Sequence, residues 1–136
     1  MTSPTSAFPL HRIVDNQGIL RKVECLHDRD LNAVVAVRLI FEELSVYMTV
    51  NCDDDTICVS GDTPVFTKDE RWSDAGGLWS KAVGRRIQWY WEMRNNQGYW
   101  DGLQIEFVEA QEAKAPICIQ AVTIASRLDM REVKIL

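Results

Sequence analysis

Residues 87–107 alternate between apolar and polar side chains on both sides of a central turn. Such alternation is typical of β-strands that bury one face. The turn, N-N-Q-G at residues 95–98, is rich in residues that tolerate positive φ. The pattern therefore predicts a β-hairpin. Its apolar positions are Ile87, Trp89, Trp91 and Met93 before the turn and Leu103, Ile105 and Phe107 after it.

The apolar positions also predict the register of this hairpin. If the loop consists of the three residues 96–98, with the glycine in the left-handed conformation, Trp91 faces Leu103 and both apolar sets share one face. A five-residue loop gives the same faces, whereas a shift by one residue would turn the whole apolar set to solvent. We therefore expect Trp89 and Trp91 to lie in the core.

A second hairpin is predicted in the first half of the chain. Apolar residues alternate over residues 35–41 and again over residues 44–50. The two apolar faces coincide when Glu42 and Glu43 form the turn. Because two glutamates are unfavourable in the tight turn of a two-residue hairpin, a wider loop in the same register is an alternative.

The remaining elements are predicted from shorter patterns. Residues 19–27 fit a strand or a helix, and we favour a strand because the segment is short and follows a glycine. Residues 78–83 predict a short helix that ends at Gly84, and residues 60–77 predict a long irregular loop. Further strands are expected at residues 10–14, 56–59 and 116–125, with a last edge strand within residues 127–136.

Together these elements predict a mainly β fold, on the border of α+β. About seven or eight short strands in succession are typical of an antiparallel meander that curls into a barrel or packs as a sandwich. At 136 residues the chain is long enough for one domain, which we expect over residues 10–136. Residues 1–9 lack the basic start and apolar stretch of a secretory signal, so they predict a flexible tail.

Composition and charge exclude several classes of function. A net charge of −5 argues against nonspecific binding to nucleic acid or to an anionic membrane, since both need a basic surface. No apolar run is long enough to span a membrane. These features predict a cytoplasmic protein that binds neither nucleic acid nor membrane.

The sequence contains no pattern typical of a metal, cofactor or catalytic site. Cys52 and Cys58 are spaced too widely for a structural zinc site, and no GxSxG, P-loop, GxGxxG or HExxH motif is present. The acidic run at residues 53–55 lacks the glycine and the distal glutamate of a calcium loop, so it predicts a solvated turn. We therefore expect no metal and no cofactor, and no residue is assigned a catalytic role.

Aromatic residues supply the candidate binding sites. Tyr90, Arg94 and Trp100 fall on the polar face of the predicted hairpin, where Arg94 would stack on the Trp100 ring in a cation–π contact. Rings mixed with charge are typical of protein interfaces or polar-ligand grooves. Trp72 and Trp79 flank the long loop, where they would fix the loop to the core or line a cleft.

Asp101 is the least expected residue of the hairpin. The predicted register places its carboxylate on the apolar face, where burial would raise its pKa, and such carboxylates gather at functional sites. The alternative is that Asp101 lies at the open end of the strand and accepts hydrogen bonds from the backbone of the turn.

Residues 79–107 resemble the central motif of an uncharacterised family of small bacterial proteins. The motif reads W-x4-G-x2-I-x-W-x-W, followed by N-N-Q-G-Y-x-D-G. It covers about a fifth of the chain. The resemblance implies a bacterial origin and a compact β-rich domain, and it carries no functional residue.

The sequence favours a non-enzymatic module that binds a protein partner or itself, in the manner of small acidic immunity proteins or regulators. A homodimer through pairing of an exposed C-terminal strand is one such form. The alternative is a small-molecule pocket lined by Trp72 and Trp79, with Asp101 as its polar anchor. An enzyme of unfamiliar type would need a second titratable group beside Asp101, and the sequence does not place one.

Overall fold

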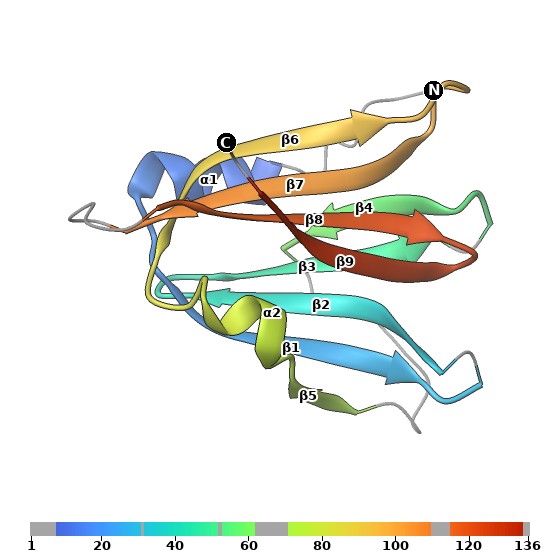
Figure 1. The fold of residues 1–136 in the computed structure, drawn as a ribbon, viewed down its shortest axis with the longest axis horizontal. Helices are drawn as coiled ribbons and strands as arrows, with labels where there is room; N and C mark the ends of the chain where they lie inside the picture. Colours follow the sequence, from blue (N-terminus) through green and yellow to red (C-terminus); the bar gives the residue numbers. More distant parts are fainter. Residues whose placement is uncertain (1–7, 31, 52, 62–70, 110–114, 135–136) are drawn as a thin grey trace.

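The computed structural model describes residues 8–30, 32–51, 53–61, 71–109 and 115–134. In these residues nine strands form two antiparallel sheets, with strand orders β4-β3-β2-β1-β5 and β6-β7-β8-β9 (Figure 1). The elements are α1 (Phe8–Asn16), β1 (Leu20–Asp28), β2 (Ala33–Phe41), β3 (Ser45–Asn51), β4 (Thr56–Ser60), β5 (Trp72–Asp74), α2 (Gly77–Ser80), β6 (Arg86–Arg94), β7 (Trp100–Val108), β8 (Ile117–Ile124) and β9 (Arg127–Val133).

The β2–β3 hairpin confirms the predicted register. Leu39 pairs with Val46, and Phe41 donates its backbone N–H to the carbonyl of Leu44 at 3.0 Å, so Glu42 and Glu43 form the two-residue turn. Because alternate residues of these strands point inward, most of the apolar set packs in the core. Val35 is the exception: it lies beside a bulge in the β1–β2 pairing and packs in a separate cluster with Leu26 and Ala36. The predicted strands at residues 19–27, 56–59 and 116–125 and the C-terminal edge strand are also confirmed, as β1, β4, β8 and β9.

The strand predicted over residues 10–14 is wrong, because this segment is the helix α1. Leu10 and Ile13 are buried at helical spacing, and the turn after the helix is a cap rather than a hairpin. Gln17 adopts a φ of 54° and Gly18 donates its N–H to the carbonyl of Ile13 at 3.1 Å. Since α1 begins at Phe8, the last two residues of the predicted tail are helical, and residues 1–7 lie outside the described residues.

The region predicted as an irregular loop contains a short strand. β5 pairs with β1 at the edge of the five-stranded sheet, and residues 62–70 of the predicted loop lie outside the described residues. The predicted helix is shorter than expected: α2 begins one residue earlier, at Gly77, and ends three residues earlier, at Ser80. The chain continues as a turn to Gly84, which has a φ of 90°.

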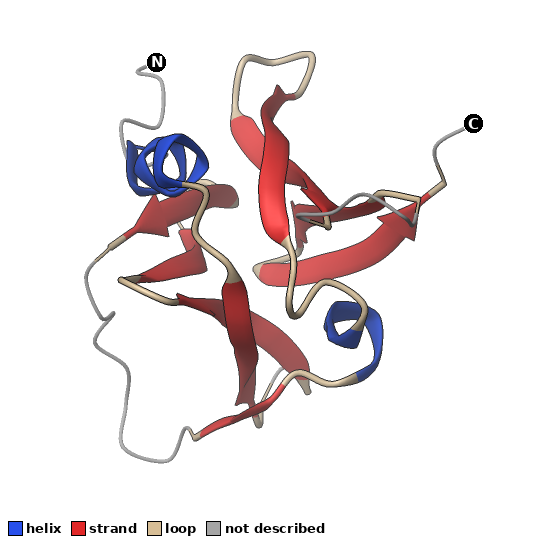
Figure 2. Cartoon of the chain, turned by 90° about the vertical axis from the view of Figure 1, so that its left-hand side faces the viewer, coloured by secondary structure: helices blue, strands red, loops and turns tan. Residues whose placement is uncertain are grey.

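The two sheets enclose one core. Buried apolar residues of both sheets form a single cluster with Leu10 of α1 and Trp79 of α2. In Figure 2 the sheets form two layers, and α1 lies beside β4 and β6 where the layers diverge. Neither sheet closes on itself in the described residues, so of the two architectures expected from the sequence the open sandwich is the one found.

Two contacts join the sheets at opposite ends. At the start of β1, Leu20 donates its N–H to the carbonyl of Arg85 and accepts the N–H of Gly84, both at 2.8 Å. At the other end, the Asp55 carboxylate in the β3–β4 turn accepts the N–H groups of Ala125 and Ser126 in the β8–β9 turn. Residues 53–55 were expected to be a solvated turn, and Asp55 instead links the two sheets.

Candidate functional site

A β-bulge in β6 determines which side chains the four-stranded sheet presents to solvent. Ile87 faces Phe107 as predicted, but Gln88 is left without a partner and Trp89 faces Glu106 instead of Ile105. The extra residue shifts the register by one from that point to Met93. The prediction that Trp89 and Trp91 lie in the core is therefore wrong: they are 57% and 43% exposed.

The two tryptophans lie on the outer face of the sheet, next to a row of hydrogen-bonded polar side chains. Gln120 donates from Nε2 to Oε1 of Gln104 at 3.1 Å, and Arg131 donates from Nε to Oε1 of Gln120 at 3.1 Å. These three residues continue the strand-to-strand row that starts at Trp91. We call this surface the tryptophan face; its residues are Trp89, Trp91, Met93, Gln104, Glu106, Gln120 and Arg131.

Met93 lies flat across the neighbouring strand because that strand has a glycine there. Met93 pairs with Gly102, and a Cβ on Gly102 would come within 2.4 Å of the Met93 methyl carbon. The Met93 sulfur accepts a weak hydrogen bond of 3.7 Å from Gln120. The thioether is therefore part of the tryptophan face, beside Trp91.

The hairpin tip holds three of the residues singled out in the sequence. The Arg94 guanidinium lies 5.4 Å from the centre of the Trp100 ring, as predicted. The loop is the predicted three-residue loop, since Asn95 donates to the carbonyl of Tyr99 at 2.9 Å. Asp101 lies in a second bulge, and its carboxylate accepts a 3.3 Å bond from the Asn95 side chain, so it lies with the turn and not on the apolar face.

Tyr90 faces the core side of the hairpin. The bulge pairs Tyr90 with Ile105, and its ring packs against the core. Burial, with the nearby charges of Glu92 and Asp15, raises the pKa of Tyr90, and burial also raises the pKa of Glu92. Alternation along β6 puts Arg94 on this same side, so the three predicted residues share a face. This face packs against the core at Tyr90 and is exposed to solvent at Arg94.

Trp72 and Trp79 lie on different parts of the molecule. Trp72, in β5, packs on Leu26 and Ala36, and the guanidinium of Arg38 lies 4.6 Å above its ring. Trp79, in α2, is buried in the core and meets Phe107 edge to face at a centroid distance of 6.2 Å. The two rings therefore do not line a common cleft.

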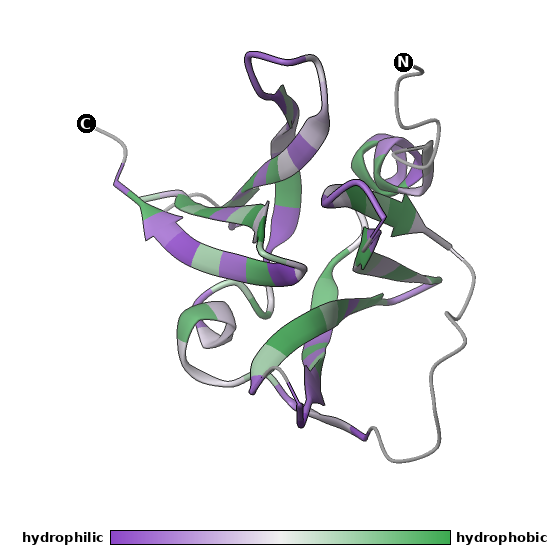
Figure 3. Cartoon of the chain, turned by 90° about the vertical axis from the view of Figure 1, so that its right-hand side faces the viewer, coloured by the Kyte–Doolittle hydropathy of each residue, from purple (hydrophilic) through white to green (hydrophobic). Residues whose placement is uncertain are grey.

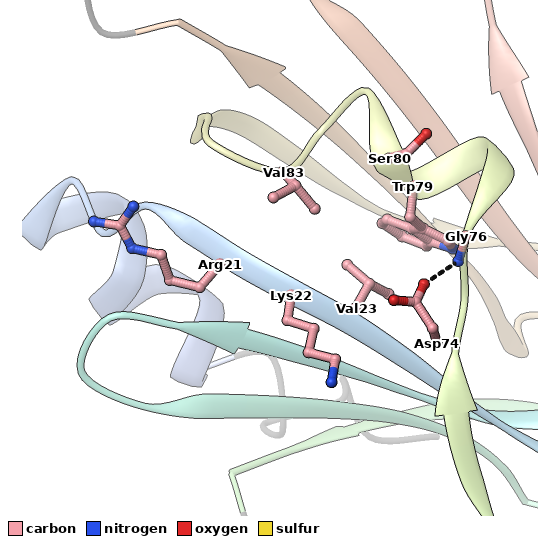
Figure 4. A pocket seen from close by; sticks show the side chains of 8 residues that line it. All are labelled: Arg21, Lys22, Val23, Asp74, Gly76, Trp79, Ser80 and Val83. Atoms are coloured by element: carbon pink, nitrogen blue, oxygen red, sulfur yellow. Dashed lines mark hydrogen bonds between the residues drawn. The ribbon is translucent and has the colours of Figure 1, made fainter.

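Trp79 does form one wall of a cavity of about 240 Å³ between α2 and β1 (Figure 4). The charged ends of Arg21 and Lys22 turn away from it, and Arg21 pairs with Glu42 at 2.7 Å. Asp101, the anchor predicted for a small-molecule site, is not among the lining residues. Those are Arg21, Lys22, Val23, Asp74, Gly76, Trp79, Ser80 and Val83.

The described residues contain neither a group of metal-binding side chains nor a helix that could span a membrane. No three His, Cys, Asp or Glu side chains among them are grouped to hold a metal ion. None of the helices in the described ranges is long and apolar enough to cross a membrane.

The fold and this surface define a two-sheet antiparallel β protein with an exposed aromatic face on one sheet. The chain belongs to DUF6334, a family of unknown function, whose family model matches residues 1–135. The resemblance of the tryptophan hairpin to an uncharacterised family is thereby confirmed. No curated protein and no solved structure matches the chain.

Sequence reasoning therefore found one of the contacts at the hairpin and missed the main surface. Arg94 and Trp100 meet as predicted, whereas Trp89, Trp91 and Met93 were assigned to the core. The segment W-Y-W places aromatic rings on both faces of a strand, so composition cannot tell which face is buried. The position of the bulge decides it.

Proposed function

We propose that this protein is a non-enzymatic protein-interaction module and that the tryptophan face is its contact surface. The observation that carries the proposal is the exposure of Trp89 and Trp91, which lie two residues apart on the same face of β6. Large exposed aromatic side chains are unfavourable in water and mark interaction sites when they cluster. Tryptophan is also the residue that most often dominates the binding energy of an interface.

The composition of the sheet supports this proposal. Protein interfaces are enriched in aromatic residues, methionine and arginine and depleted in lysine. The tryptophan face has two tryptophans, Met93 and Arg131, and no lysine occurs in β6, β7, β8 or β9. Polar groups at its centre are already paired with each other, so a partner does not have to satisfy them.

The size and charge of the chain support a role like that of an immunity protein or a regulator in the bacterial cytoplasm. Such proteins act by covering a surface of their partner, which requires a rigid face and no catalytic group. A small chain with a net charge of −5 fits that profile. The small-molecule alternative has less support, because Asp101 lies at the hairpin tip and away from the cavity beside Trp79.

The test is site-specific photo-crosslinking in the cells that naturally produce the protein. A benzophenone amino acid at position 91 should give a discrete adduct, whereas the same group at Lys22, an exposed residue of the other sheet, should give none. A benzophenone at Trp100 examines the competing surface at the hairpin tip. An adduct from position 100 and none from position 91 would contradict the proposal, as would the absence of any adduct.

A further inference from the structure

We propose that the tryptophan face binds a second copy of this chain, around a two-fold axis that runs parallel to the strands between β7 and β8. The inference rests on the proposed function, because it names the partner of the same surface. A two-fold interface requires a face that is complementary to itself. The arrangement of side chains across the sheet meets that requirement.

The central row of the face is self-complementary. From edge to edge it reads Trp91, Gln104, Gln120 and Arg131, one residue from each strand. Rotation about an axis between β7 and β8 places β6 of one copy over β9 of the other. Each Trp91 ring then lies over Arg131 of the second copy, a cation–π arrangement that occurs twice in the dimer.

The sizes of the side chains are also complementary under this rotation, because those that project far from the sheet lie near one edge. The bulky residues of the face, Trp89, Trp91 and Met93, are all on β6. Shorter side chains occupy the flanking rows towards the other edge, namely Cys118 and Val122 of β8 and Asp129 and Val133 of β9. The long side chain of Arg131 is the exception, and it is hydrogen-bonded to Gln120 beside it. The rotation brings the high side of one face over the low side of the other, as close packing of two sheets requires.

The charges of the face allow two copies to meet. The tryptophan face contains Glu106 and Arg131, and the neighbouring positions on the same side of β9, Asp129 and Arg127, add one charge of each sign. This side of the sheet is therefore balanced in charge. The excess of acidic over basic groups that gives the chain a net charge of −5 lies on other parts of the chain. A neutral face on an acidic protein can contact its own copy without local repulsion.

The edges of the sheet are less suited to self-association than its face. β6 carries a bulge at Gln88 and turns Glu92 inward, and both features oppose pairing with a further strand. β9 turns Glu132 towards Lys81, with which it pairs at 3.2 Å. These features disfavour the strand-paired dimer considered from the sequence.

The area of the face predicts a weak dimer. Four strands about 4.8 Å apart and about seven residues long at about 3.4 Å per residue cover roughly 450 Å². Two such faces give roughly 900 Å² of buried area if each face is treated as a plane, and protruding side chains add to this value. The total is near the lower limit of about 1,000 Å² for specific interfaces. The dimer should therefore form in the micromolar range and dissociate on dilution.

The experiment is sedimentation velocity of the purified chain over about 1 to about 200 µM. The wild type should shift from monomer to dimer, and Trp91→Ala and Arg131→Ala should each weaken the dimer by about tenfold or more. The matched controls are Trp100→Ala and Arg94→Ala, which remove the same residue types from the hairpin tip and should change the dissociation constant by less than about twofold. Circular dichroism verifies that each variant is folded.

Mixing the two face variants tests the two-fold axis itself. A dimer of Trp91→Ala with Arg131→Ala keeps one intact contact, between Trp91 of one copy and Arg131 of the other, whereas each homodimer keeps none. The mixture should therefore associate more tightly than either variant alone. A mixture no better than its components would overturn the proposed axis, and equal weakening by the controls would assign the interface to the hairpin tip.

The two proposals fail in different ways. A wild type that stays monomeric over the whole range overturns the self-association. If position 91 then crosslinks to a different protein in cells, the interaction module stands and only the identity of the partner is wrong. If position 91 gives no adduct, both proposals fail.

Discussion

At the scale of single residues, Glu24 holds together a cluster on the outside of the five-stranded sheet. Arg38 donates from Nε to Oε1 of Glu24 at 2.8 Å and also from its Nη2 atom. The same guanidinium lies over the rings of Trp72 and Tyr47. The hydrogen bond from Arg38 holds the pKa of Glu24 below its ordinary value of 4.5, against the opposing effect of burial.

We expect Glu24→Gln to lower the free energy of unfolding at pH 7 by about 1–2 kcal/mol, because it removes a charged hydrogen bond that is partly buried. A lowered pKa in the folded state stabilises the fold above pH 4.5, and this contribution is lost as the pH falls through the folded pKa. The difference between variant and wild type should therefore shrink in acid. Urea denaturation at several pH values measures it, with Glu43→Gln in the exposed β2–β3 turn as the control.

A second residue-scale feature is the β8–β9 turn, which contains no glycine. Ala125 and Ser126 both adopt left-handed conformations, with φ values of 51° and 65°. This is the backbone of the tight hairpin turns that normally require Asn or Gly. The Asp55 carboxylate stabilises the turn by accepting both N–H groups, at 3.1 and 2.9 Å.

Ala125→Gly should raise the free energy of unfolding by about 0.5–1 kcal/mol, since relief of the left-handed backbone outweighs the greater chain entropy of the unfolded state. Ala121→Gly, in the regular and buried part of β8, should instead lower it. Urea denaturation of the two variants and of the wild type measures both changes in the free energy of unfolding. A loss of stability in Ala125→Gly as large as that in the control would show that the turn is not strained.

At the scale of elements, one unpaired residue decides the surface of a whole sheet. At Gln88, β6 has one residue more than the paired stretch of β7. Beyond this bulge Trp89 and Trp91 therefore point outward and Tyr90 points inward. Strand β9 alternates polar and apolar residues from Arg127 to Arg131, and bands of both kinds are visible on it in Figure 3. Alternation predicts faces only as far as the next bulge.

Deletion of Gln88 should leave the fold intact, because it removes the bulge and keeps Ile87 and Tyr90 inward and Trp89 and Trp91 outward. We expect the free energy of unfolding to fall by less than about 2 kcal/mol. Quenching of tryptophan fluorescence by iodide should stay as in the wild type. The control is deletion of Tyr90, which would turn Trp91 inward and should cost more than about 3 kcal/mol.

The same experiment separates the observed register from the predicted one. In the register without a bulge, deletion of Gln88 would invert every residue after Ile87 and destroy the fold. Protection of the tryptophans from iodide, or loss of the folded state, would therefore contradict the bulge.

At the scale of the whole molecule, contacts between distant segments decide the architecture of the fold, which the sequence patterns do not determine. The choice between barrel and sandwich depends on the two contacts that join the sheets, at Leu20 and at Asp55. These contacts bring together residues far apart in the chain, and no local pattern identifies them. The segment at residues 10–14 shows the same limit, because it is short enough to fit either period and becomes a helix where the layers diverge.

The sequence by itself determined both hairpin turns, most of the strands and the contact of Arg94 with Trp100. These features depend on neighbouring residues, since turn chemistry and two-residue alternation act over a few positions. The tertiary structure decided the helix α1, the link from Asp55 and the exposure of Trp89 and Trp91. A bulge and a link between sheets are selected by the packing of the whole core, which the residues beside them do not reveal.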